Sequence, residues 1–210
     1  MAFNQNQEVK IKTSDGTQLE VIDEFTYLGA LVSSTIADIK RRIALAWTAS
    51  NKMHKIWRSP LSRKFKLRLF TSTVESVLLY GCEAWTLTEK LERKIDGCYT
   101  RLLRASLGYT WKDKITNEIL YGEIPKVTSK IRTRRLKLAG HIYRHPEEAA
   151  KELLMWTPLY GRRKKGRPTR TYVQQLEEDT GMNSCEMGTA MENREVWRNI
   201  AGRSSTLRHE

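Results

Sequence analysis

The first third of the chain changes from an alternating pattern of apolar and polar residues to a helical one. Residues 8–22 read EVKIKTSDGTQLEVI, and their apolar positions alternate with polar ones on both sides of an Asp15-Gly16 turn. This pattern is typical of a β-hairpin. Residues 25–32 predict a third short strand. Three short strands do not make a stable sheet alone, so we expect this element to pack on another surface.

From residue 36 onward the apolar period is helical. The first stripe spans about 120° of a helix circumference and consists of Ile36, Ile39, Ile43, Ala46, Trp47, Met53 and Trp57. Pro60 ends this helix. Further helices are expected at residues 62–80, 88–107, 128–144, 171–179 and 185–201, with a short helix or turn at 111–121. The fold class predicted is mainly α with a small N-terminal β element.

Positive charge is concentrated in the middle of the chain. The 210 residues contain 37 Lys and Arg against 24 Asp and Glu, a formal net charge of +13. Such an excess is expected of proteins that work against phosphate or another anionic surface. It does not indicate a fold.

Basic residues are sorted onto one side of the helix predicted at 88–107. Five of them project within about 100° of one another, beside an apolar stripe: Lys90, Arg93, Lys94, Arg101 and Arg104. A basic row next to a buried row is what a helix following a phosphate backbone requires. A solvated helix face would carry the same residues, and the sequence leaves that alternative open.

Two further basic groups lie nearer the C-terminus. Residues 128–144 gather Arg134, Lys137 and Arg144 on one face, with His141 and His145 beside them. Residues 161–170, GRRKKGRPTR, contain no acidic residue and six basic ones: Arg162, Arg163, Lys164, Lys165, Arg167 and Arg170. Gly166-Arg167-Pro168 resembles the core of an AT-hook, whose arginine enters a narrow minor groove. A nuclear-import signal or non-specific attraction to nucleic acid explains the same residues.

The sequence offers no catalytic centre, metal site or cofactor site. No Ser-His-Asp order, glycine-rich phosphate loop or paired magnesium-binding carboxylates can be found. Cys82, Cys98 and Cys185 have no disulfide-framework spacing, and the His141 and His145 pair has no third ligand near it. No apolar run is long enough to cross a bilayer. We therefore expect an intracellular protein, nuclear or cytoplasmic, that binds no membrane.

Tryptophan is the last feature of interest, because its indole can stack on nucleobases. The chain has six tryptophans, and core packing is the default expectation for most of them. Trp111 is predicted to be exposed, because Lys112, Asp113 and Lys114 follow it.

An ordered series of segments carries a resemblance to a known family. The segments are EFTYLGALVSS, DIKRRIALAWTASNKMHKIW, KLRLFTSTVESVLLYGCEAWTLT, RLLRASLGYTWKDKITNEIL, RRLKLAGHIYRHPEE and GRRKKGRPTRTY. Together they resemble the C-terminal third of the reverse transcriptase of non-LTR (LINE-type) retrotransposons, of the kind that carries an N-terminal endonuclease. The resemblance covers residues 8–200.

This resemblance implies three parts. Residues 1–35 would be the edge of the polymerase palm, 36–125 its helical thumb, and 126–210 a basic region beyond the thumb. Phe25, Tyr27, Leu28 and Gly29 would correspond to the turn that grips the primer. The fingers, the catalytic carboxylates and the endonuclease have no counterpart in this sequence, so Mg²⁺ would belong to the missing palm.

The expected function is binding of RNA or DNA, as a template and primer duplex or as DNA alone, by a fragment of an RNA-directed DNA polymerase. Five to eight neutralised phosphates would give a slope of roughly −4 to −7 for log K against log salt. Two alternatives stay open. One is a helical module that docks onto a protein, for example the remaining polymerase domains, and the other is a non-functional remnant of an element.

Overall fold

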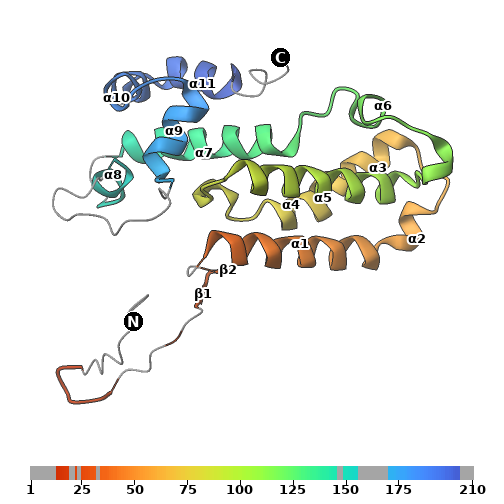
Figure 1. Ribbon diagram of the computed structural model, residues 1–210, viewed down its shortest axis with the longest axis horizontal. Coiled ribbons are helices and arrows are strands. Elements are labelled where there is room, and N and C mark those ends of the chain that lie inside the picture. The colour runs from red at the N-terminus through yellow and green to blue at the C-terminus, as the bar shows by residue number, and fades with distance from the viewer. Residues whose placement is uncertain are drawn as a thin grey trace.

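Helices dominate the computed structural model, which describes residues 13–18, 22, 25–31, 34–145, 149–155 and 170–203. A layered helical bundle forms one end of the molecule, and a group of shorter helices covers one end of the bundle's last helix (Figure 1). The mainly α fold with a small N-terminal β element is therefore confirmed.

The bundle is built from helices that run back and forth. α1 (Thr35–Lys52) and the short α2 (His54–Trp57) lead into α3 (Arg63–Phe70), which continues through a π-helical turn (Thr71–Glu75) into α4 (Ser76–Leu78). A 3₁₀ turn (Cys82–Ala84) precedes α5 (Glu89–Leu107). A second 3₁₀ turn (Trp111–Asp113) and α6 (Asn117–Tyr121) lead to α7 (Val127–Tyr143). α1 and α7 pack on opposite sides of α5 (Figure 1).

The interior of the bundle follows the predicted apolar stripes. Ile39, Ala46 and Trp57 are buried from the first stripe, and Ile95 and Leu102 from the stripe on α5. Ile36 differs, because it is exposed at the first turn of α1. Burial of these side chains supplies most of the driving force for the bundle, at about 25 cal/mol per Å² of apolar surface.

A second core forms where α7 extends past the bundle. Around its C-terminal half pack α8 (Ala149–Leu154), α9 (Tyr172–Thr180), α10 (Ser184–Glu192) and α11 (Arg194–Arg203). The buried apolar side chains of this core are Leu136, Ala139, Leu154, Val173, Leu176, Met187, Met191, Trp197 and Ala201. We call these four helices the C-terminal cap.

Trp197 fixes α11 against α7. Its indole is buried and its Nε1 donates a hydrogen bond to the carbonyl of Leu136 at 2.6 Å. The ring lies directly over Gly140, where a Cβ atom would come within 2.2 Å of the indole. Gly140 is thus required for close contact between a ring and the helix backbone.

Two helical predictions need correction. Residues 185–201 form two helices, because Asn193 leaves the helical conformation and its side chain accepts from the amides of Glu195 and Val196 to cap α11. α8 was missed, because it lies in a segment with proline at both ends, residues 146 and 158, which was interpreted as irregular.

The predicted strand at residues 25–32 is instead a tight hairpin. β1 (Thr26–Tyr27) pairs antiparallel with β2 (Ala30–Leu31), and Leu28 and Gly29 form the turn with positive φ angles of 46° and 81°. Two positive φ angles are the geometry that two-residue hairpin turns prefer. Most of the hairpin expected at residues 8–22 lies outside the described residues; of it, residues 13–18 contain the Asp15-Gly16 turn, closed by Thr13 and Thr17.

Replacing Gly140 by alanine should destabilise the protein by about 2 to 3 kcal/mol, because the new methyl group must displace the Trp197 ring. Gly97→Ala, within α5, is the matched control. A Cβ atom there meets nothing within 4 Å, so alanine should stabilise by about 0.5 to 1 kcal/mol through helix propensity alone. Urea unfolding, monitored by circular dichroism, measures the free energy of unfolding of both variants. Equal behaviour of the two variants would contradict the described packing of Trp197.

Candidate functional site

An open groove of ≈ 1410 Å³ lies between the first turns of α1, the N-terminal half of α5 and the region around α9. Its cationic side chains come from three separate parts of the chain: Lys40 from α1, Lys90, Arg93 and Lys94 from α5, and Arg170 from the residues before α9. We call this feature the basic groove. It contains three of the residues that the sequence singled out on the helix at 88–107.

Four cations of the basic groove are available to a ligand. Lys40, Lys90, Arg93 and Lys94 are exposed and, within the part of the chain that the structure describes, form no ion pair. Three carboxylates also line the groove. Glu178 pairs with Arg170, and Glu177 accepts a hydrogen bond from Ser184 at 2.6 Å. Glu89 and Glu177 keep their negative charges, so two carboxylates oppose the four cations.

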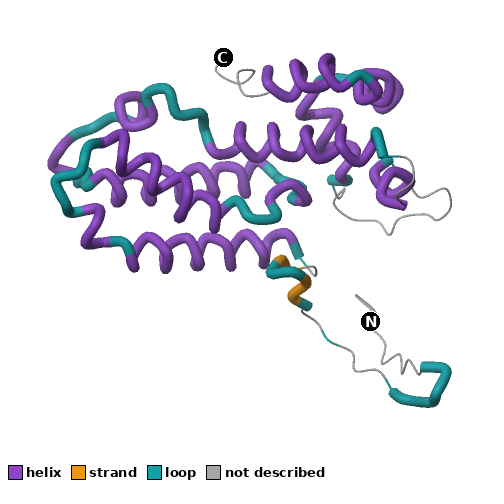
Figure 2. Tube along the Cα trace, turned by 180° about the vertical axis from the view of Figure 1, so that it is seen from behind, coloured by secondary structure: helices purple, strands orange, loops and turns teal. Residues whose placement is uncertain are grey.

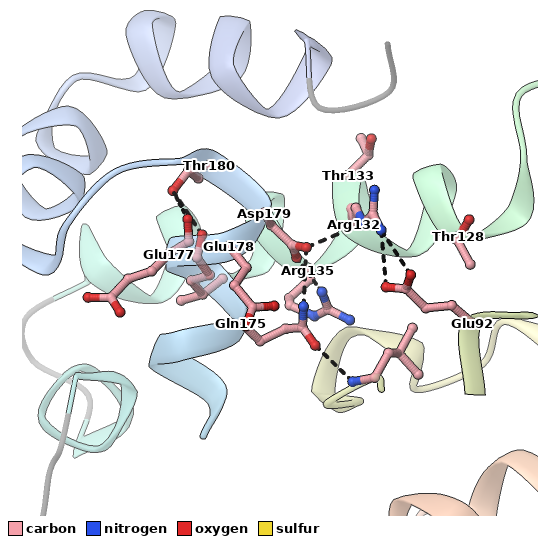
Figure 3. Close-up of polar contacts among 12 residues, drawn as sticks. Glu92, Thr128, Arg132, Thr133, Arg135, Gln175, Glu177, Glu178, Asp179 and Thr180 are labelled. Carbon is pink, nitrogen blue, oxygen red and sulfur yellow. Dashed lines mark hydrogen bonds and ion pairs between the residues drawn. The ribbon is translucent and has the colours of Figure 1, made fainter. Parts of the chain in front are cut away.

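A buried charge network joins α7 to α9 (Figure 3). Arg135 is fully buried; it forms an ion pair with Asp179 and donates to the carbonyl of Trp85 at 2.8 Å. Arg132 lies beside it, with its Nη2 at 3.0 Å from Glu92 and its Nε at 3.4 Å from Asp179. Burial raises the pKa of the Asp179 carboxyl, and Arg135 and Arg132 oppose that shift.

The same network fixes the residues that precede α5. Gln175 of α9 accepts from the amide of Leu87 at 2.8 Å, and Arg170 donates to the carbonyl of the same residue. Tyr172 donates to the carbonyl of Glu83 at 3.1 Å. α9 is therefore attached to the segment that leads into α5, and the two sides of the basic groove are held at a fixed separation.

The remaining predicted cations do not join the groove. Arg101 is exposed and donates to the carbonyl of Gly97 on its own helix at 3.3 Å. Arg104 donates to the carbonyl of Ile115 at 2.8 Å and to Asn117 at 2.9 Å, so it fastens the loop that follows α5.

The predicted cations of α7 lie elsewhere on the molecule. Arg134 and Lys137 line a smaller pocket of ≈ 340 Å³, where Arg134 donates to the carbonyl of Leu79 at 3.2 Å. Arg144 donates to the carbonyl of Met191 at 2.9 Å and so attaches α10 to α7. Arg162, Arg163, Lys164, Lys165 and Arg167 lie outside the described residues.

The β1–β2 hairpin lies beside the start of α1 (Figure 2). The carbonyl groups of its turn, Leu28-Gly29, attach it to the bundle. Arg41 and Arg42 donate to the carbonyl of Gly29, and Tyr80 donates to that of Leu28 at 2.7 Å.

The turn presents apolar side chains to solvent. Tyr27 is 60% exposed and Leu28 74% exposed, and Phe25 stacks beside Tyr27 with ring centroids 6.5 Å apart. Backbone atoms thus attach the turn to the bundle, while its side chains face outward.

Several residues of this site escaped sequence analysis. Lys40 belongs to a helix whose basic residues show no separate row, and Arg42 and Tyr80 act only through tertiary contacts with the hairpin. Arg135 is adjacent to the buried Leu136, which places it at the edge of the apolar face of α7. That position is the one signal in the sequence that could have distinguished it from Arg134.

Among the described residues, no group of three His, Cys, Asp or Glu side chains could hold a metal ion. The rings of His141 and His145 lie next to each other with centroids 4.2 Å apart and their planes tilted by 48°. The described helices include none that is both long and apolar enough to cross a bilayer. Trp111 is 85% exposed, which confirms the prediction made from the residues that follow it.

Comparison with known proteins gives one informative likeness. The chain is 27% identical to an uncharacterized transposon-derived protein of Caenorhabditis elegans, over 92% of this chain and 75% of that protein. No family model and no solved structure matches. The likeness supports a transposon origin for this chain.

Arg135→Ala should destabilise the protein by about 3 to 5 kcal/mol, because it leaves the buried Asp179 carboxylate with only part of its compensation. Arg134→Ala is the matched control on the next residue. Its side chain is 41% exposed and lies 3.9 Å from Glu83, so its loss should cost about 1 kcal/mol or less. Thermal unfolding monitored by circular dichroism distinguishes them. A small effect of Arg135→Ala would show that the cap does not depend on this pair.

The three thiols should differ in reactivity. Cys82 and Cys98 are buried and Cys185 is exposed; burial raises the pKa of the Cys82 thiol to about 12 and also raises that of Cys98. A disulfide reagent at pH 8 should therefore titrate one thiol in the native protein and three after denaturation, because only a thiolate attacks. Rapid loss of a second thiol in the native protein would mean that the bundle opens readily.

Proposed function

We propose that this chain is the nucleic-acid-binding portion of a transposon-derived polymerase, comparable to the thumb and the adjoining basic region of a LINE-type reverse transcriptase. It would hold the backbone of a template and primer duplex, or of DNA, and contribute no catalytic residue. One observation carries the proposal: four exposed cations without ion-pair partners among the described residues face a single long groove.

The geometry of the basic groove suits a polyanion better than a small anion. Lys90, Arg93 and Lys94 lie within the first two turns of α5, and Lys40 faces the groove from α1. Charges spread along an open groove contact successive phosphates, whereas a small anion is usually enclosed by convergent donors. Such contacts give affinity without reading base sequence, so specificity is expected to be low.

The transposon origin adds support from a different direction. A mobile element must bring its proteins into contact with nucleic acid, and the resemblance to LINE-type reverse transcriptases assigns α1 to α5 to the thumb. In that comparison Phe25, Tyr27, Leu28 and Gly29 would form the primer-gripping turn, which the described hairpin presents beside the start of α1.

A second candidate function rests on the same hairpin. The exposed Tyr27 and Leu28 form an apolar tip that could dock onto a protein, for example the rest of a polymerase. In that function the basic groove would serve solubility only.

Charge reversal of the groove tests the proposal. The triple variant Lys90→Glu, Arg93→Glu and Lys94→Glu should weaken duplex binding by roughly two to three orders of magnitude near 0.1 M salt. It should also reduce the slope of log K against log salt by about 3, because each phosphate contact contributes about 0.9 to that slope. Fluorescence anisotropy with a labelled duplex over a salt series measures both quantities.

The matched control is Lys52→Glu, Arg58→Glu and Lys55→Glu. These residues are exposed: Lys52 ends α1, Lys55 lies in α2, and Arg58 follows α2 directly. Like the groove variant, the control replaces two lysines and one arginine. This triple variant changes the net charge equally and should retain most of the affinity. If both variants lose binding alike, attraction is a property of net charge and the groove has no special role. Affinity that does not vary with salt would favour the protein-docking function.

A further inference from the structure

The turn that follows α5 lies at the opposite end of this helix from the basic groove. The chain leaves α5 at Gly108, which ends the helix with φ 78°, and a 3₁₀ turn (Trp111–Asp113) follows. Because α5 has 19 residues and rises about 1.5 Å per residue, its two ends are about 28 Å apart. Contacts at this turn are therefore independent of those in the groove.

Trp111 differs from the other described tryptophans. Trp57, Trp85 and Trp197 are buried, and Trp47 packs against the bundle core. Trp111 alone among the tryptophans of the described residues is largely exposed, at 85%. An indole is among the largest apolar surfaces that a protein can bury, so leaving it in water forgoes a large stabilisation.

The turn holds this indole outward by a defined backbone. Asp113 accepts from the amide and the hydroxyl of Thr110 at 2.6 and 2.7 Å, and its own amide donates back to the carbonyl of Thr110. These bonds lower the pKa of the Asp113 carboxyl. Lys114 then takes a positive φ of 48°, a conformation that a lysine adopts only where its surroundings fix it.

Both sides of the turn are anchored to the bundle. Tyr109 and Ile115 pack against the first core, and Arg104 donates to the carbonyl of Ile115. The exposed indole is thus carried by a short, fixed turn between two anchored residues. A rigid platform of this kind loses little conformational entropy when a ligand stacks on it.

The charges around the indole indicate what it would bind. Lys112 and Lys114 are exposed, and the ammonium of Lys112 lies 5.9 Å from the indole centroid. Asp113, which lies between them in sequence, keeps its negative charge and is held to the turn by its hydrogen bonds from Thr110. Residues 108–116 carry no second exposed large apolar side chain, as a protein or membrane contact would require. An exposed aromatic plane with a cation beside it and a second cation three residues further on matches a base and its neighbouring phosphates.

We propose that Trp111 stacks on an unpaired nucleobase while Lys112 and Lys114 contact the neighbouring phosphates, so that this turn binds the single-stranded part of a nucleic acid whose duplex part occupies the basic groove. The inference rests on the proposed nucleic-acid binding. The separation of about 28 Å corresponds to about eight base pairs at 3.4 Å each, which sets the length of duplex between the two contacts.

The test uses the full chain and measures its binding to three labelled ligands by fluorescence anisotropy. The ligands are a 12-nucleotide oligothymidylate, an abasic strand of equal length, and a blunt duplex. Trp111→Ala should weaken oligothymidylate binding by about 5- to 150-fold, the range for loss of one stacked base, and leave the other two ligands unchanged. Trp111→Phe should restore most of the affinity. Since no charge changes, the salt slope should stay the same.

The double variant Lys112→Ala and Lys114→Ala provides the complementary control. It should weaken the base-containing and abasic strands equally, because both retain their phosphates. Unchanged oligothymidylate binding by Trp111→Ala would overturn the stacking role, and so would equal weakening of the abasic strand.

The outcome separates this inference from the proposed function. If charge reversal in the groove abolishes duplex binding while Trp111→Ala has no effect, the groove function stands and the stacking role fails. If the wild-type chain binds none of the three ligands, both fail. Trp111-dependent binding to anionic vesicles, without oligonucleotide binding, would assign the turn to a membrane surface instead.

Discussion

The buried ion pair between Arg135 and Asp179 determines how the two cores are joined. Arg135 projects from α7, reaches Asp179 on α9 and also holds the carbonyl of Trp85 ahead of α5. Taking two charges out of water is costly, and the hydrogen bond from Arg135 to the carbonyl of Trp85 and the contact of Arg132 with Asp179 offset part of that cost. Together with the bonds from Gln175 and Arg170 to Leu87, this contact holds α9, which lines the basic groove, beside the segment that leads into α5.

Local signals in the sequence predicted much of the fold. The helix ending at Gly108 and the exposed Trp111 depend on a few neighbouring residues, and both were found. Contacts between residues that are distant in sequence were not predicted. Arg132, Arg134 and Arg135 look alike in the sequence, and Asp179, which distinguishes them, lies 44 residues beyond Arg135. The helical period of a sequence indicates on which face of a helix a residue lies. It does not indicate which carboxylate or carbonyl that residue will bind.

In the candidate site, too, the local pattern could be predicted and the long-range contacts could not. The row of basic residues on α5 was visible from its helical period, and Lys90, Arg93 and Lys94 do line one groove. Arg104 belongs to the same row, yet it binds the carbonyl of Ile115, because the loop after α5 folds back toward it. Lys40 reaches the groove from another helix. A row on one helix therefore predicts a surface, while the loops around it decide which of its members remain free.

α7 belongs to both cores at once, and this limits how the chain could be divided. Its N-terminal half contributes Ile131 to the bundle, and its C-terminal half contributes Leu136 to the cap. A cut inside α7 that removes one core would expose apolar side chains of the other core to solvent. A fragment that keeps both cores therefore has to contain all of α7 together with the helices that pack on each of its halves.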